Sequence, residues 1–206
     1  MLKKLRYRFE AFFIWLLFKI FSRLSPEKAS DFGGWIGRTV GSKLAASRKA
    51  KRNILLSFTS YDNHLADKTV TGMWDNLGRI ISEYAHLKTL GTEYYTEVIG
   101  GDIIEQLRDS GKGAICFGGH LGNWEIPASA TFVQYGFKMP PVYRAPNNPW
   151  VDKMLVDCRR IDPSIESFSK SASGTRELVK HVRSGGVAGI VFDQKYNIMT
   201  FLESHH

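Results

Sequence analysis

The chain has 206 residues, 43% of them hydrophobic, and only two cysteines, a composition that excludes a disordered protein and a scaffold framed by disulfides. Its formal charge of +8 is uneven, because residues 1–60 hold 13 Lys and Arg against 3 Asp and Glu, while residues 61–206 hold 15 against 17. The basic segment suits an anionic membrane surface, and a nucleic-acid partner is not expected because no recognisable nucleic-acid-binding motif accompanies it.

The first predicted element is an apolar helix within residues 1–24. An uninterrupted apolar run occupies residues 11–18, which is shorter than the roughly 20 residues that span a bilayer. Basic residues flank the run on both sides, and no small-residue cleavage site follows it. We therefore expect a membrane anchor that lies in one leaflet, with anionic lipids as its partner; a buried core helix is the alternative.

Two longer helices are predicted next. The Ser-Pro pair at residues 25–26 is typical of a helix start, and this helix is expected to run to about Ser47. Glycines recur at every fourth residue from Gly33 to Gly41, which leaves one helix face without side chains and predicts close packing against another helix. Residues 67–86 carry apolar side chains at three-to-four spacing and are predicted to face the core.

The pattern changes at residue 113, where short apolar runs begin to alternate with amphipathic stretches of helix length. This alternation is typical of an α/β fold, with a mostly parallel sheet flanked by helices. Helices are predicted to start at Asn148 and at Ser173. The expected strands are residues 114–117, 141–143 and 187–192. The expected organisation is a membrane anchor helix at 1–24, a helical part of the catalytic domain at 25–112, and an α/β catalytic core at 113–206.

Three polar residues come shortly after the three predicted strands. His120 lies three residues after the first strand, and Arg144 and Asp193 directly follow the second and the third. Because ligands bind outside the carboxyl ends of parallel strands, we expect these side chains at one edge of the sheet. The remaining histidines have no metal-ligand spacing, so neither a metal nor another cofactor is predicted.

The sharpest motif is Gly-Gly-His-Leu-Gly-Asn-Trp-Glu at residues 118–125, which places His120 and Glu125 five residues apart in a glycine-rich turn. On a regular helix these side chains would diverge by about 140°, so a turn must bring them together. A carboxylate on one imidazole nitrogen fixes the tautomer and leaves the other nitrogen as a general base toward an alcohol. The alternative is a loop histidine and a glutamate that is favoured at a helix N-terminus for electrostatic reasons alone.

With these motifs the chain resembles the lipid A late acyltransferases, the lauroyl and myristoyl transferases of lipid A biosynthesis. The resemblance rests on the glycine-rich turn, on Val-Tyr-Arg-Ala-Pro-Asn-Asn-Pro at residues 142–149 and on Phe-Asp-Gln-Lys at residues 192–195. It implies a fold like that of the glycerol-phosphate acyltransferases, with His120 as the base and Glu125 as its carboxylate partner. The substrate-binding residues that it implies are Asn123, Trp124, Arg144, Asp193 and Gln194.

Two of the remaining residues allow more than one reading. Arg144 could stabilise a developing oxyanion or hold a phosphate of the acceptor through its planar guanidinium group. A structural ion pair with a carboxylate such as Asp152 is the alternative for Arg144. Cys116 could in principle form an acyl-enzyme, but it lies inside an apolar strand, where a thiol is normally inert, and is therefore predicted to be a core residue.

The resemblance also implies a reaction. A fatty acyl chain would move from an acyl carrier protein thioester to a hydroxyl of a lipid A precursor, at the cytoplasmic face of the bacterial inner membrane. Another glycolipid acceptor, such as a phosphatidylinositol mannoside, is the alternative. The resemblance implies a chain that continues well beyond residue 195, whereas this sequence stops soon after it and lacks the glycines of the family pattern there. The core is therefore expected to be C-terminally incomplete, and a non-catalytic, membrane-associated remnant is the second alternative.

Overall fold

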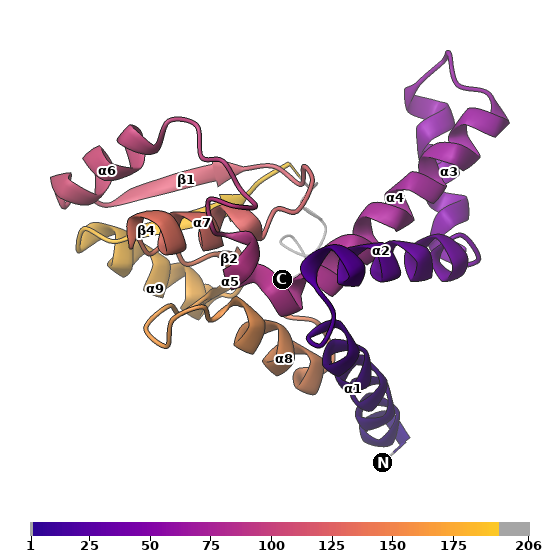
Figure 1. Cartoon of the computed structure of the whole chain (residues 1–206), viewed down its shortest axis with the longest axis horizontal. Coiled ribbons are helices and arrows are strands. Elements are labelled where there is room, and N and C mark those ends of the chain that lie inside the picture. The colour runs from indigo at the N-terminus through magenta and orange to yellow at the C-terminus, as the bar shows by residue number, and fades with distance from the viewer. Residues whose placement is uncertain (1, 194–206) are drawn as a thin grey trace, which may run out of the picture.

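The computed structural model describes residues 2–193, which form a helical part and an α/β part (Figure 1). Gln194 and the divergent residues 196–206 lie outside this described range. The helical part consists of α1 (Leu2–Phe21), α2 (Pro26–Ile36), the π-helical turn η1 (Gly37–Gly41), α3 (Ala45–Ser57) and α4 (Asn63–Glu83). Two short helices, η2 (Tyr84–His86) and α5 (Leu87–Leu90), then lead into the α/β part.

The α/β part contains short parallel strands between helices. Its elements are α6 (Gly101–Ser110), β1 (Ala114–Gly118), α7 (Ile126–Tyr135), β2 (Val142–Tyr143), α8 (Pro149–Arg159), β3 (Phe168–Ser169), α9 (Ala172–Arg183) and β4 (Val187–Val191). Strand β1 pairs with β4 and β2 pairs with β3, both in parallel. A parallel bridge between Pro141 and Gly189 connects the two pairs. The predicted parallel strands flanked by helices are confirmed, although they form two small sheets.

The predicted glycine face packs directly against α4. A Cβ atom at Gly33 or Gly37 would overlap backbone oxygens of α4, and one at Gly41 would overlap the ring of Trp74. The prediction of close helix packing is therefore confirmed. The two helices can approach this closely because the glycines remove the side chains that normally separate packed helices.

The predicted single helix from residue 26 to about Ser47 is wrong, because the chain turns at residues 42–44. The hydroxyl of Ser47 donates to the carbonyl oxygen of Gly41 over 2.7 Å and accepts from the indole N–H of Trp74 over 2.8 Å. These bonds satisfy backbone and side-chain polar groups across the turn, so α3 begins there as a separate helix.

Side-chain caps define where several helices begin. Asn148 accepts from the backbone N–H of Trp150 at the start of α8, as predicted. Helix α9 is capped by Ser171, two residues before the predicted Ser173, and Asp62 caps α4, which begins four residues before its predicted start at residue 67. Each cap satisfies a backbone N–H that has no partner inside the helix.

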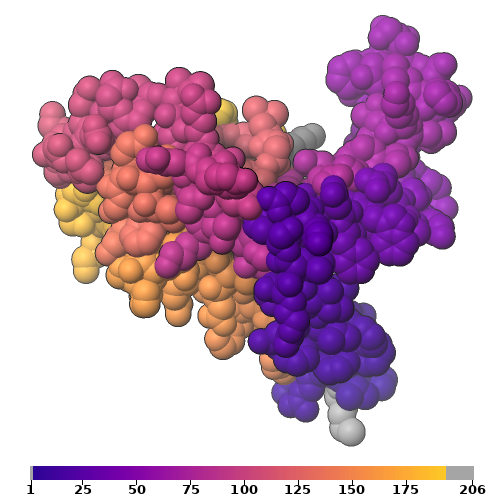
Figure 2. Space-filling view, viewed as in Figure 1, coloured from indigo at the N-terminus to yellow at the C-terminus, as the bar shows by residue number. Residues whose placement is uncertain are grey.

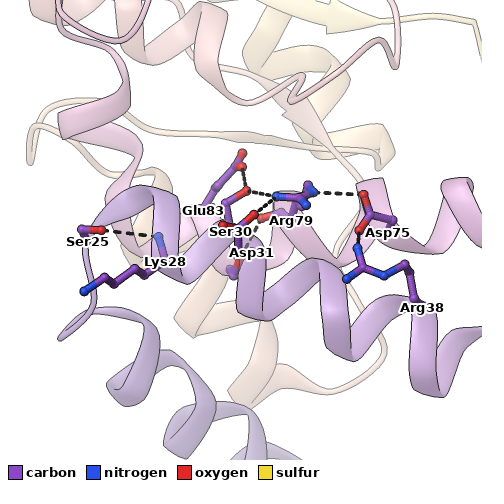
Figure 3. A network of polar contacts seen from close by, with 9 residues as sticks. Ser25, Lys28, Ser30, Asp31, Arg38, Asp75, Arg79 and Glu83 are labelled. Atoms are coloured by element: carbon purple, nitrogen blue, oxygen red, sulfur yellow. Dashed lines mark hydrogen bonds and ion pairs between the residues drawn. The ribbon is translucent and has the colours of Figure 1, made fainter.

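A network of polar side chains joins α2 to α4 beside the glycine contact (Figure 3). Arg79 of α4 donates to Asp75 over 3.0 Å, to Asp31 over 2.8 Å and to Ser30 over 3.2 Å. The hydroxyl of Ser30 in turn donates to Glu83 over 2.6 Å. Glu83 is the last residue of α4, so the network ends beside the turn that leads to the α/β part.

Helix α1 is attached to the α/β part at residues far away in sequence. The side-chain amide of Asn148 donates to the carbonyl oxygen of Tyr7 over 2.8 Å, and His86 lies 2.9 Å from the carbonyl oxygen of Phe21. The other side of the helix is an exposed apolar stripe: Leu2, Leu5, Phe9, Phe12 and Leu16. Among residues 2–193, no helix combines the length and the apolar character needed to cross a bilayer. Membrane association therefore stays a prediction.

The glycine contact gives the first test. Replacing Gly37 by Ala places a Cβ against the backbone of Trp74, and we expect the free energy of unfolding to fall by about 1–3 kcal/mol. The control is Gly72→Ala on α4, where nothing lies within 4 Å and the better helix former should add up to about 1 kcal/mol. Denaturant unfolding followed by circular dichroism measures both, and equal midpoints would contradict the close α2–α4 contact.

Candidate active site

The glycine-rich turn follows β1 at the carboxyl edge of the β1–β4 pair. Strand β1 ends at Gly118, and α7 starts at Ile126. Gly122 has a φ of 53°, a left-handed conformation that only glycine adopts readily, and it allows the chain to reverse inside the turn. Asp193 comes two residues after the end of β4, so the parallel pairing of β1 with β4 brings it beside His120.

His120 and Asp193 are joined by two hydrogen bonds. Nδ1 of His120 lies 2.6 Å from Oδ1 of Asp193, and the backbone N–H of His120 donates to Oδ2 over 2.8 Å. The bond from the His120 ring, followed by the bond from its backbone N–H, lowers the pKa of Asp193. An ionised Asp193 favours a proton on Nδ1, and Nε2 of His120 makes no hydrogen bond within residues 2–193. The prediction that His120 and Asp193 meet at one sheet edge is confirmed.

The predicted pairing of His120 with Glu125 is wrong. The Glu125 carboxylate accepts two bonds from Arg159, both 2.8 Å long, and one from the hydroxyl of Tyr84 over 2.5 Å. Its oxygens point toward α8 and η2, because the turn separates His120 from Glu125, the residue before α7, and directs the two side chains apart. The wider proposal that Glu125 takes part in catalysis stays a prediction.

Glu125, Arg159 and Tyr84 form a cluster that is largely shielded from water. The Glu125 side chain is 9% exposed and that of Arg159 is 14% exposed. Burial alone would lower the pKa of Arg159, but its bonds to Glu125 and the negative charge there raise it. Burial and the charge of Glu125 raise the pKa of Tyr84. Arg159 therefore remains charged, and the tyrosine remains a neutral donor.

Asn123 and Trp124 hold the turn on the helical part. The side-chain amide of Asn123 donates to Glu83 over 2.7 Å, and its carbonyl oxygen accepts from the backbone N–H of Glu125 over 3.0 Å. Trp124 packs against the core formed by Ile80, Tyr84 and Leu87. Its ring also meets that of His120 edge to face, with 4.7 Å between the centroids. The structure thus places both residues around His120, and their predicted contact with substrate stays a prediction.

Arg144 follows β2 at the carboxyl edge of the strands and is exposed. The bridge between Pro141 and Gly189 is parallel, so β2 ends at the same edge as β4. Within the described range the Arg144 side chain has no ion pair, and the alternative pairing with Asp152 is not found. Gln194, the last predicted substrate-binding residue, lies outside the described residues.

The cysteines and the metal-ligating side chains offer no second chemical centre in residues 2–193. Burial raises the pKa of Cys116 and raises that of Cys158 to about 11, so both thiols stay protonated at neutral pH. In the same range, no three His, Cys, Asp or Glu side chains gather as a metal site would require.

Arg159, the cation that pairs with Glu125, was not predicted from the sequence. Arg159 and Arg160 are adjacent near the end of α8, and the sequence offers no signal to separate them. Only the packing of α8 decides that Arg159 points inward while Arg160 is exposed. The guanidinium group of Arg159 also lies 5.3 Å from the ring centroids of both Tyr84 and Tyr143.

Comparison with known proteins gives one match. A family model described as bacterial lipid A biosynthesis acyltransferase matches residues 1–201. No curated protein and no solved structure matches the chain. The matched range includes both the turn that carries His120 and the strand end that carries Asp193.

The buried cluster gives the second test. Arg159→Met leaves the Glu125 carboxylate buried without its counter-charge, and we expect the free energy of unfolding to fall by about 3–5 kcal/mol. Arg160→Met is the matched control, because this neighbour is exposed and should change stability by less than about 0.5 kcal/mol. Combining Arg159→Met with Glu125→Leu removes both charges and should recover part of the loss. If the double variant is no more stable than Arg159→Met, the stabilising role of the pair is refuted.

Proposed function

Because the chain belongs to the bacterial lipid A biosynthesis acyltransferase family, we propose that it transfers a fatty acyl chain of the lauroyl or myristoyl class from an acyl carrier protein thioester to a hydroxyl of a lipid A precursor. The observation that carries this proposal is the 2.6 Å contact between His120 and Asp193 at the carboxyl edge of the parallel strands. This contact orients a general base in a turn that is open to substrate.

The His120–Asp193 pair can activate an alcohol. Asp193 accepts a hydrogen bond from Nδ1–H and holds the ring, which leaves the lone pair of Nε2 free to take the proton of the acceptor hydroxyl. The hydroxyl oxygen attacks the thioester carbonyl carbon, the carbon–sulfur bond breaks, and the thiolate leaves. The imidazolium then returns its proton to the thiolate, so the histidine regains its starting form. Asp193 remains ionised throughout and stabilises the imidazolium.

Arg144 is a candidate for binding an anionic substrate. It is exposed, it lies at the sheet edge that carries His120 and Asp193, and no ion pair within the described residues neutralises it. A guanidinium group binds a phosphate through two parallel hydrogen bonds, which suits a phosphorylated glycolipid acceptor. The paired catalytic groups also favour an active enzyme over a non-catalytic remnant.

The exposed stripe of α1 supports a place at a membrane. Its five large apolar residues recur every three or four positions and share one side of the helix, while the opposite side holds the α/β part through Asn148. A helix with this arrangement lies in the interface plane with its apolar side among the lipid chains. We place the enzyme at the cytoplasmic face of the inner membrane, where a soluble acyl carrier protein can reach it.

Incubation of the detergent-purified protein with acyl carrier thioesters and a lipid A precursor tests the reaction, with mass spectrometry of the lipid as readout. We expect one added lauroyl or myristoyl chain, and a roughly 10²–10⁴-fold slower transfer for both His120→Ala and Asp193→Asn. Asp193 is 43% exposed, so Asp193→Asn should leave the unfolding midpoint nearly unchanged. Near-normal turnover of a folded Asp193→Asn variant would contradict the proposed mechanism. Acylation of a phosphatidylinositol mannoside in place of the lipid A precursor would instead refute the proposed acceptor.

Vesicle flotation tests the role of α1. Phe9→Gln combined with Phe12→Gln removes two exposed apolar side chains and should weaken binding to lipid vesicles at least about tenfold, because each buried large side chain contributes about 1.5–3 kcal/mol. The matched control is Ile99→Gln with Ile103→Gln, which alters two exposed apolar residues of the α/β part. Unchanged flotation of the α1 variant would refute α1 as the anchor.

A further inference from the structure

Helix α3 and the first half of α4 form an arm that projects from the rest of the molecule (Figure 1). In the space-filling view this arm stands clear of the α/β part (Figure 2). It does not carry the His120–Asp193 site, and the mechanism above uses none of its residues. A projecting element of this size, with little of α3 buried, needs a separate explanation.

One side of α3 is exposed and basic, and we call its residues Arg48, Lys49, Arg52 and Leu56 the α3 face. Arg48 and Lys49 are neighbours, and Arg52 and Leu56 follow at spacings of three and four residues, so the four side chains emerge within roughly 100° around the helix axis. The opposite side packs on α4, where Ser47 is buried and accepts from the indole of Trp74 over 2.8 Å. The α3 face therefore points away from the protein.

The charges of the α3 face are not neutralised inside the described structure. Helix α3 contains no acidic residue, and its remaining cation, Lys51, pairs with Asp67 of α4 over 2.8 Å. By contrast, Arg48, Lys49 and Arg52 have no ion pair within residues 2–193. Three like charges on one exposed side repel one another, so an anionic surface that covers them is favoured.

Large apolar side chains accompany these charges at the end of the arm. Leu56 is 75% exposed, and Phe58 in the following loop is 53% exposed. Phe58 stacks on Tyr61 with 5.1 Å between the ring centroids, so the loop presents two aromatic rings side by side. At a lipid–water interface, basic groups bind at the level of the headgroups, and side chains such as Leu and Phe insert among the lipid chains below. The α3 face and Phe58 offer both kinds of group.

We propose that the α3 face and Phe58 form a second membrane contact that binds anionic lipid headgroups. Each Lys or Arg near an anionic leaflet strengthens binding roughly fivefold, so three such residues strengthen it considerably. The arm and α1 both lie on the side of the molecule away from the strands, where they extend in different directions (Figure 1). The proposal rests on the proposed function only in that it places the enzyme at a membrane.

Lipid explains the α3 face better than an acidic protein partner does. Charge alone would fit either occupant, but Leu56 and Phe58 add exposed apolar surface at the projecting tip of the arm. An acidic protein would leave this tip in water unless it also offered a matching apolar pocket. A bilayer accepts such side chains without a shaped pocket, because its interface is fluid.

The test compares two triple variants of the full chain. Arg48→Gln with Lys49→Gln and Arg52→Gln neutralises the α3 face, and Arg176→Gln with Lys180→Gln and Arg183→Gln neutralises three exposed cations of α9. Binding is measured to vesicles of phosphatidylcholine with phosphatidylglycerol and to vesicles of phosphatidylcholine alone. We expect the α3 variant to bind the anionic vesicles at least about tenfold more weakly and to lose part of the salt dependence. The α9 variant should change this binding less than about twofold.

A second pair of measurements separates the alternatives. Leu56→Gln with Phe58→Gln should weaken binding to both kinds of vesicle, and the α3 variant should keep its turnover on detergent-dispersed substrates. Equal anionic-vesicle binding by the α3 variant and the unmodified chain would overturn the proposal. So would a loss of acyl carrier protein binding with vesicle binding intact, which would assign the face to a protein. A failed acyl-transfer assay leaves the vesicle result interpretable, because binding is measured without turnover.

Discussion

The buried ion pair between Arg159 and Glu125 is the interaction on which the active-site geometry depends. It connects α8, the start of α7 and, through Tyr84, the end of the helical part. Removing two charges from water is costly, and an unpaired buried charge costs several kcal/mol more, so the three elements are held together. The glycine-rich turn that carries His120 begins at β1 and ends at this pair. Its conformation is therefore fixed at both ends.

The two carboxylates near His120 have different roles because their surroundings differ. Glu125 is 9% exposed and its oxygens are occupied by Arg159 and Tyr84, which suits a structural anchor. Asp193 is 43% exposed and bonds to the ring and the backbone of His120, which suits the orientation of a base. The polar chain from Ser30 through Glu83 to Asn123 supports the same turn from the helical part. The close glycine contact between α2 and α4 in turn positions Ser30 beside Glu83.

Several features could be predicted from the sequence because each depends on local pattern. The repeat from Gly33 to Gly41 predicted close helix packing, and alternating apolar runs predicted parallel strands between helices. Topology alone predicted that His120 and Asp193 meet, since both follow strands of one parallel sheet. The predicted length of the helix from residue 26 to about Ser47 was wrong, because the turn after Gly41 depends on Trp74 of another helix.

What the sequence by itself determined is the family and the sheet edge at which the polar residues His120, Arg144 and Asp193 gather. Which carboxylate serves His120 was decided only by the tertiary structure. Glu125 is close to His120 in sequence, whereas Asp193 follows it by 73 positions and reaches it only through the pairing of β1 with β4. Sequence spacing specifies neither the direction of a side chain after a glycine turn nor the contact of Arg159, at the end of α8, with Glu125. Both features depend on packing between elements that are distant in sequence, because a buried charge needs an opposite charge beside it and only the folded chain decides which residue lies there.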